Sequence, residues 1–132
     1  MADTMKFSLV SPERMLVEVD STQAQIPGVE GELTALPGHA PFLTTLRPGL
    51  VRVATAEGMA EYFVTGGFAE IAPDETTVLA EEAFERELLK RAYIEEKLAE
   101  AETALADAPD YRRIAAAQRV ADLRLAIDHL GL

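Results

Sequence analysis

The sequence of 132 residues contains no cysteine and no tryptophan, and it has only 12 lysines and arginines against 23 acidic residues. Without cysteine, the chain has no disulfide framework, thiolate chemistry or cysteine-based zinc site. The net charge of −11 disfavours binding to nucleic acid or anionic lipid, because phosphates repel an acidic protein. No apolar run approaches the ~18 residues that span a bilayer, and the first residues do not resemble a secretion signal. The composition predicts a soluble, acidic globular protein.

The composition changes near residue 82. Residues 1–82 carry 13 acids and 4 bases and hold six of the seven prolines and seven of the eight glycines. Residues 83–132 carry 10 acids and 8 bases and are rich in alanine, leucine, glutamate and arginine, which are strong helix formers. We therefore expect one domain over residues 1–82 and a helical arm over residues 83–132.

The first part reads as short β-strands. Segments 5–10, 16–19, 50–54, 62–64 and 76–80 alternate between apolar and polar residues, and proline or glycine turns recur about every ten residues. This spacing is typical of an antiparallel sandwich or barrel rather than of βαβ units. Gly66 and Gly67 interrupt an apolar run, which indicates a bulge or a sharp corner between two strands.

The second part has helical periodicity. Apolar residues recur at positions 94, 98, 101 and 105, and again at 116, 120, 123, 127 and 130, so each segment has one apolar face. The short link at 106–110 predicts an antiparallel hairpin, with an aspartate and Pro109 opening the second helix and Gly131 ending it. A first helix over about 83–106 would be roughly 36 Å long. The predicted fold class is an antiparallel β-sandwich followed by a two-helix hairpin.

Residues able to support catalysis are scarce. His39 and His129 have no cysteine and no second histidine nearby, so neither has the companions of a zinc site. None of the three serines lies on a nucleophile elbow, and no glycine-rich phosphate loop occurs. Acidic pairs such as Glu30 and Glu32 are expected to be solvated surface in so acidic a chain. The sequence predicts no catalytic residue and no metal site.

Residues 37–41, PGHAP, predict a rigid exposed turn, because two prolines bracket a glycine and a histidine. From composition alone, the turn is a plain corner between strands that carries a surface histidine.

Four segments resemble the epsilon subunit of F-type ATP synthases, which is equivalent to the mitochondrial delta subunit. Residues 31–41 read GELTALPGHAP, where the family has a glycine-glutamate pair and then LPGHAP. The other three segments are LRPGLVR at 46–52, TGGFAEI at 65–71 and TVLA at 77–80. With the helical tail, the resemblance covers essentially the whole chain.

The resemblance implies a non-catalytic subunit of the central stalk, which couples rotation of the c-ring and gamma subunit to ATP synthesis. Gly31 and Glu32 match the loop that meets the polar loops of the c-ring. His39, Ala40 and Pro41 match the turn that faces gamma. For Glu32, contact with the ring is preferred over plain solvation, although a rim ion pair adds little affinity.

The resemblance also implies that the hairpin can extend into the catalytic head and inhibit ATP hydrolysis. Basic residues of the second helix would then meet an acidic segment of the beta subunits, within the alpha/beta head. In this chain the candidates are Arg112, Arg113, Arg119 and Arg124. The alternative is an ordinary solvated helix face, which the sequence leaves open.

Many bacterial members bind ATP through an aliphatic-Asp-x-x-Arg-Ala motif. Here residues 87–92 read ELLKRA: Arg91 and Ala92 match, but Leu88 replaces the aspartate and Glu87 the aliphatic residue. We therefore expect no resident cofactor, and ATP binding that is weak or absent.

Two alternatives remain at this stage. One is an ATP-sensing regulatory subunit whose hairpin position reports the nucleotide level. The other is an unrelated sandwich-plus-hairpin adaptor. The resemblance implies a location on the cytoplasmic face of a bacterial plasma membrane, held peripherally through the c-ring, with no insertion into lipid and no contact with nucleic acid.

Overall fold

The computed structural model describes residues 3–130, and the chain divides into two compact units, Met1–Arg86 and Glu87–Leu132. The first unit holds ten strands and the second holds two α-helices. The division falls four residues after the expected domain end at 82. The reason is that Ala83–Glu85 form a short strand that pairs with the sandwich; the segment contains Phe84, a residue that favours strands.

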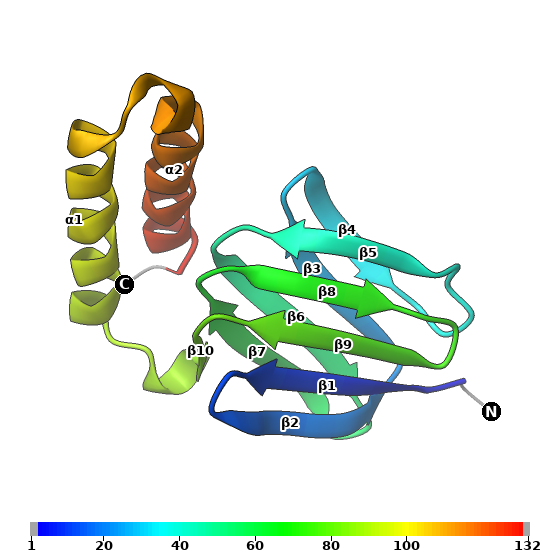
Figure 1. Ribbon diagram of the computed structural model, residues 1–132. Coiled ribbons are helices and arrows are strands. Elements are labelled where there is room, and N and C mark those ends of the chain that lie inside the picture. Colours follow the sequence, from blue (N-terminus) through cyan, green and yellow to red (C-terminus); the bar gives the residue numbers. More distant parts are fainter. Residues whose placement is uncertain (1–2, 131–132) are drawn as a thin grey trace. The chain divides into compact units, whose positions relative to one another are not determined.

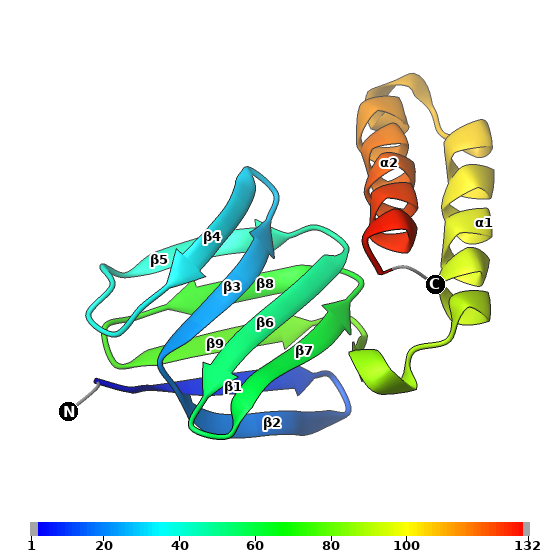
Figure 2. The same ribbon diagram turned by 180° about the vertical axis from the view of Figure 1, so that it is seen from behind.

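The strands are β1 Met5–Ser11, β2 Arg14–Ser21, β3 Gln23–Gly28, β4 Gly31–Ala35, β5 Phe42–Leu46, β6 Gly49–Thr55, β7 Gly58–Val64, β8 Gly67–Ile71, β9 Glu75–Ala80 and β10 Ala83–Glu85. Strands β5, β8, β9, β1 and β2 form one layer (Figure 1), and β4, β3, β6, β7 and β10 form the other (Figure 2). The predicted antiparallel sandwich is confirmed. The parallel pair β1–β9 is a feature that the sequence did not predict.

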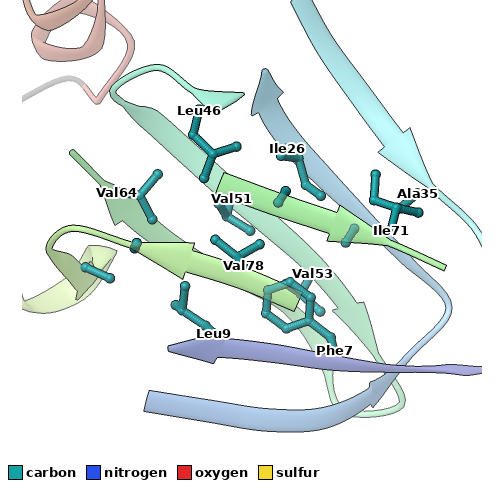
Figure 3. Packing of buried hydrophobic residues seen from close by; sticks show 14 of the residues in the cluster. Phe7, Leu9, Ile26, Ala35, Leu46, Val51, Val53, Val64, Ile71 and Val78 are labelled. Carbon is teal, nitrogen blue, oxygen red and sulfur yellow. The ribbon is translucent and has the colours of Figure 1, made fainter. Parts of the chain in front are cut away.

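The core lies between the two layers and consists of alternate residues of nearly every strand (Figure 3). Phe7 and Leu9 of β1 and Val78 of β9 meet Ile26 of β3 and Val53 of β6, and all five side chains are fully buried. Apart from Ile26, whose strand was not predicted, these are apolar positions of the alternating segments, as expected for strands with one face inward. Burial of each such side chain stabilises the fold by about 1.5–3 kcal/mol.

The corner between β7 and β8 is built from two glycines. Gly66 and Gly67 have φ angles of +150° and +133°, which side chains rarely tolerate. A Cβ atom on Gly67 would overlap the backbone of Leu79 and Ala80. The predicted sharp corner is therefore confirmed, and close backbone packing requires glycine at its second position.

The second unit is an antiparallel hairpin of α1 Arg91–Asp107 and α2 Arg113–Leu130, joined through the 3-10 turn η2 Asp110–Arg112. Ile94 and Ala101 of α1 and Val120, Leu123 and Leu130 of α2 are buried. These residues belong to the two predicted apolar stripes. Arg124 and Glu102 join the helices through an ion pair at 3.5 Å.

The ends of the helices differ from the predictions. The first helix begins at Arg91 rather than near 83, because residues 83–85 pair with β7 and Lys90 has an extended backbone, with φ −102° and ψ 142°. At 17 residues it is about 26 Å long instead of 36 Å. Pro109 occupies the N-cap position of η2, and no aspartate side chain caps it. The predicted stop at Gly131 lies outside the described residues.

Within residues 3–130, no helix is both long and apolar enough to cross a membrane.

Candidate partner-binding surfaces

One outer face of the sandwich carries an unbroken row of apolar side chains. Phe68 of β8 pairs with Leu79 of β9, Leu79 pairs with Val10 of β1, and Val10 pairs with Met15 of β2. Phe68, Leu79 and Val10 alternate with the core residues of their strands, so their side chains point away from the core. A bulge shifts the β1–β2 register between Leu9 and Val10 and places Met15 opposite Val10. We call these four residues the apolar row.

The apolar row is open to solvent. Phe68 is 52% exposed, Leu79 48% and Met15 55%, while Val10 is half-buried. Leu43 of β5 lies on the same face and is 67% exposed. It pairs with Glu70, the position two residues beyond Phe68, so Leu43 is a diagonal neighbour of the row. Contiguous exposed apolar residues of this kind are typical of a binding surface.

The apolar row was not predicted from the sequence. Val10 and Leu79 stand at positions where the alternation within segments 5–10 and 76–80 predicts polar residues, and Met15 and Phe68 lie outside the segments predicted as strands. At Phe68 and Leu79 both faces of the strand are apolar. A sandwich whose outer face is open to water does not need apolar residues there, so this pattern could have indicated a binding surface.

The predicted ring-contact residues lie on the β3–β4 hairpin. Gly28 and Gly31 pair across a two-residue turn, and Glu32 pairs with Pro27. The hairpin is tied to β5, because the Val29 amide donates to the Thr45 carbonyl at 2.9 Å. Glu32 is exposed. The tip therefore presents a carboxylate on an anchored backbone.

The predicted gamma-contact residues lie at the other end of β4, in the connection to β5. The His39 amide donates to the Leu36 carbonyl at 3.0 Å, and Gly38 has a φ of +84°, which makes Pro37–Gly38 the centre of a tight turn. The Gly38 amide donates to the Pro73 carbonyl at 2.7 Å, which ties the turn to the β8–β9 connection. The predicted rigidity has this structural basis.

The His39 side chain bonds locally, with Nδ1 2.6 Å from the Ala40 carbonyl oxygen. Ala40 and Pro41 are exposed. This turn and the hairpin tip at Glu32 are separated by the length of β4, about 17 Å for five residues. The structure therefore presents two separate candidate surfaces rather than one site.

The four arginines of the arm differ in their surroundings. Arg112 stacks on the Tyr111 ring, 5.7 Å from its centroid, and Arg113 donates to the Ala108 carbonyl at 3.4 Å. Arg124 pairs with Glu102 of α1. Arg119 is half-buried, whereas the other three are exposed. Arg112 and Arg113 lie together at the tip of the hairpin, where α2 begins.

The segment that resembles the ATP motif lies at the start of α1. Arg91 pairs with Glu95 one helical turn later, with 2.6 Å between Nε and Oε1. Leu88, at the position of the motif's aspartate, is 70% exposed. Arg91 and Ala92 are exposed as well. The guanidinium group therefore already has a carboxylate partner.

An ion cluster on the sandwich includes Arg86, the last residue of the first unit. The Glu61 carboxylate accepts from Arg52 at 3.0 Å and from Arg86 at 3.1 Å. Next to this cluster, Tyr62 of β7 pairs with Glu85 of β10. Burial, and to a smaller extent the charge of Glu85, raise the pKa of Tyr62 above its usual value of 10.0.

Across the described part of the chain, no group of three or more histidine, cysteine or acidic side chains is arranged to hold a metal ion.

Comparison with known proteins identifies the family. The family model for the beta-sandwich domain of the ATP synthase delta/epsilon chain matches residues 4–86. The ATP synthase epsilon chain of Rhodobacter capsulatus is 49% identical over 132 residues, covering 100% of both chains. That of Ruegeria sp. is 46% identical over 137 residues, again covering 100% of both chains. The chain belongs to the ATP synthase delta/epsilon family.

Two solved structures share the fold. A chain of the Euglena gracilis mitochondrial ATP synthase, from an assembly with the c-ring, matches with a TM-score of 0.74 at 22% identity, covering 96% of this chain and 81% of that one. A chain of the central stalk and c-ring of the Tetrahymena thermophila mitochondrial ATP synthase matches with a TM-score of 0.69 at 16% identity, covering 97% of both. The match of the family model ends at residue 86, where the structure also divides the chain.

Proposed function

We propose that this chain attaches to its neighbours through the sandwich and uses the helical hairpin as a regulatory arm. As an epsilon-type chain, it is a central-stalk subunit of an F-type ATP synthase and couples rotation of the stalk to ATP synthesis. The observation that carries this function is the full-length similarity to named ATP synthase epsilon chains. The Tetrahymena neighbour belongs to a central stalk with its c-ring, which supports the same role.

The gamma subunit is the proposed partner of the layer that bears the apolar row. Exposed apolar side chains on a rigid sheet provide most of the affinity of a stable interface. The anchored turn with His39, Ala40 and Pro41 lies at the edge of the same layer and extends this surface. Since Gly38 ties the turn to the Pro73 carbonyl, the turn can transmit torque with little deformation.

The c-ring is the proposed partner of the β3–β4 hairpin, through Gly31 and Glu32. The exposed carboxylate of Glu32 suits a basic or amide-bearing loop of the ring. A solvent-exposed ion pair contributes at most about 1 kcal/mol, so this contact sets orientation more than affinity. The backbone bond from Val29 to Thr45 keeps the hairpin in position.

The alpha and beta subunits of the catalytic head are the proposed partners of the extended arm. Arg112 and Arg113 lie at the hairpin tip, and we propose that these two arginines bind an acidic segment of the head. Arg124 already pairs with Glu102, which makes it a structural residue of the hairpin, and Arg119 is half-buried. Inhibition of hydrolysis would therefore depend most on the two arginines at the tip.

ATP is proposed to bind weakly or not at all. Leu88 offers no carboxylate to orient the nucleotide, and Arg91 is engaged by Glu95. This argues against the alternative that the chain is mainly an ATP sensor. We assign the chain no catalytic residue and no cofactor, and we propose that it lies on the cytoplasmic face of a bacterial plasma membrane as a peripheral component.

Reconstitution of the catalytic head with gamma tests this function. ATP hydrolysis is compared without this chain, with the full chain, and with a version ending at Arg86, the last residue of the first unit. We expect both versions to join the complex and only the full chain to lower hydrolysis. Failure of both versions to join would refute the function. Equal hydrolysis with both versions would refute the inhibitory role of the arm alone.

A further inference from the structure

The two units of the chain are joined through β10 and η1, which make few backbone pairs with the sandwich. Strand β10 has three residues and pairs only with β7, at one edge of the sheet order. Of its side chains, only Ala83 is buried. The next element, η1 Arg86–Leu88, contains no buried residue, and Leu89 directly after it is buried. A three-residue edge strand followed by an exposed turn should open easily.

One side chain of the sandwich counters this weakness. Glu61 of β7 accepts a charge-assisted hydrogen bond from Arg86, directly after β10, at 3.1 Å. The Glu61 side chain is 25% exposed and that of Arg86 40%, so the pair is only partly shielded from solvent. The bond fixes the segment at the point where the first unit ends.

Glu61 also bonds Arg52 of β6, at 3.0 Å. That second bond spans β6 and β7, which already pair over seven register positions. Its loss should therefore change little. The bond to Arg86 instead supports β10, which pairs with β7 over only three positions. Loss of the Glu61 carboxylate should therefore destabilise β10 more than it destabilises the β6–β7 pair.

We propose that the Glu61–Arg86 pair is a clamp that sets the length of the tether between the sandwich and the helical hairpin. With the clamp closed, the tether is residues 87–90, which reach at most about 14 Å. With it open, β10 detaches back to Glu82, whose carbonyl accepts from the Thr65 amide at 3.1 Å. The tether then becomes residues 83–90 and reaches about 28 Å.

The clamp does not depend on the identity of any partner. The reach of the arm becomes a property of one ion pair in the sandwich. Removal of the Glu61 charge also leaves Arg52 and Arg86 close to each other without a shared anion, and their repulsion favours opening.

Hydrogen exchange on the full chain tests the clamp. In Glu61→Gln we expect the amides of residues 83–86 to exchange about two- to five-fold faster than in the unchanged chain. The matched control is Arg52→Gln, which keeps the Glu61–Arg86 bond and should leave those rates unchanged. At 1 M salt the difference between Glu61→Gln and the unchanged chain should shrink. Should Glu61→Gln fail to fold, Arg86→Gln carries the same expectation.

A second measurement follows the tether itself. Because the chain has no cysteine, spin labels can be placed at Thr34→Cys and Ala104→Cys, one in each unit. The distribution of label distances should broaden in Glu61→Gln and stay unchanged in Arg52→Gln. Unchanged exchange at 83–86, an equal effect of Arg52→Gln, or an unchanged distance distribution in Glu61→Gln would each overturn the clamp.

Discussion

Phe68 and Leu79 lie directly opposite each other on the outer face of β8 and β9, and each is about half exposed. On either side, Thr45 pairs with Phe68 and Val10 pairs with Leu79. The cross-strand contact of a phenylalanine and a leucine gains little for the isolated fold while both remain in water. Their placement side by side is better explained by a partner that covers them.

The first prediction separates binding residues from core residues. Phe68→Ser should lower the free energy of unfolding by no more than about 1 kcal/mol, because the side chain is already half in water. Phe7→Ala, at a fully buried position, should lower it by about 3–5 kcal/mol. Urea unfolding of the two variants measures both values. A loss at Phe68 as large as that at Phe7 would make the apolar row part of the core.

The second prediction concerns the β7–β8 corner. Gly67→Ala should destabilise the chain by about 3 kcal/mol or more, because the added methyl group overlaps the Leu79 backbone and the residue keeps a φ of +133°. Gly58→Ala is the matched control: its φ is +123°, but nothing lies within 4 Å of the added atom. It should cost only about 1–2 kcal/mol. Equal thermal or urea stability of the two variants would contradict the role of close packing at Gly67.

The third prediction concerns nucleotide binding. The unchanged chain should bind ATP with a Kd no tighter than about 1 mM, a free energy near −4.1 kcal/mol, because Leu88 supplies no carboxylate. Leu88→Asp should tighten binding measurably in calorimetric titration, and Leu88→Ala, which removes the side chain without adding charge, should not. A low micromolar Kd for the unchanged chain would contradict this prediction and restore the ATP-sensor alternative.

The fourth prediction concerns the tip of the arm. Replacement of Arg112 and Arg113 by glutamine should weaken inhibition of ATP hydrolysis several-fold in the reconstituted head, and salt should weaken it in the unchanged chain. Arg47→Gln, on the sandwich, is the control and should have no effect. If the double replacement inhibits as well as the unchanged chain, the arginines are an ordinary solvated helix face.

The fold could be predicted largely from local patterns, because alternation and turn residues determine strands at Phe7–Leu9 and a period of 3.6 determines helices at Val120–Leu123. The residue at which the helical arm begins could not be predicted in this way. Residues 83–90 are rich in helix formers, yet β10 pairs with β7, a tertiary contact that overrides local preference. The capping role given to an aspartate near Pro109 was wrong, since Pro109 itself takes the N-cap position of η2 and no side chain caps it.

The candidate surfaces could be predicted only in part. The rigid turn at His39 follows from its prolines and Gly38. The hairpin at Glu32 was not predicted, because β3 and β4 lie outside the segments expected to be strands. The apolar row is formed by β8, β9, β1 and β2, which come from distant parts of the chain. Register across strands decides that Phe68, Leu79, Val10 and Met15 meet, and a single sequence does not contain that register.

The most direct test of the account is the affinity of the purified gamma subunit for Phe68→Ser/Leu79→Ser, compared with the unchanged chain. The control is Met59→Ser, which removes a side chain of similar exposure, 56%, from β7 in the other layer. We predict a loss of at least about tenfold for the double variant, since buried aromatic and aliphatic anchors dominate interfaces, and no loss for the control. Undiminished affinity of the double variant, with its fold intact, would contradict the assignment of this face to gamma.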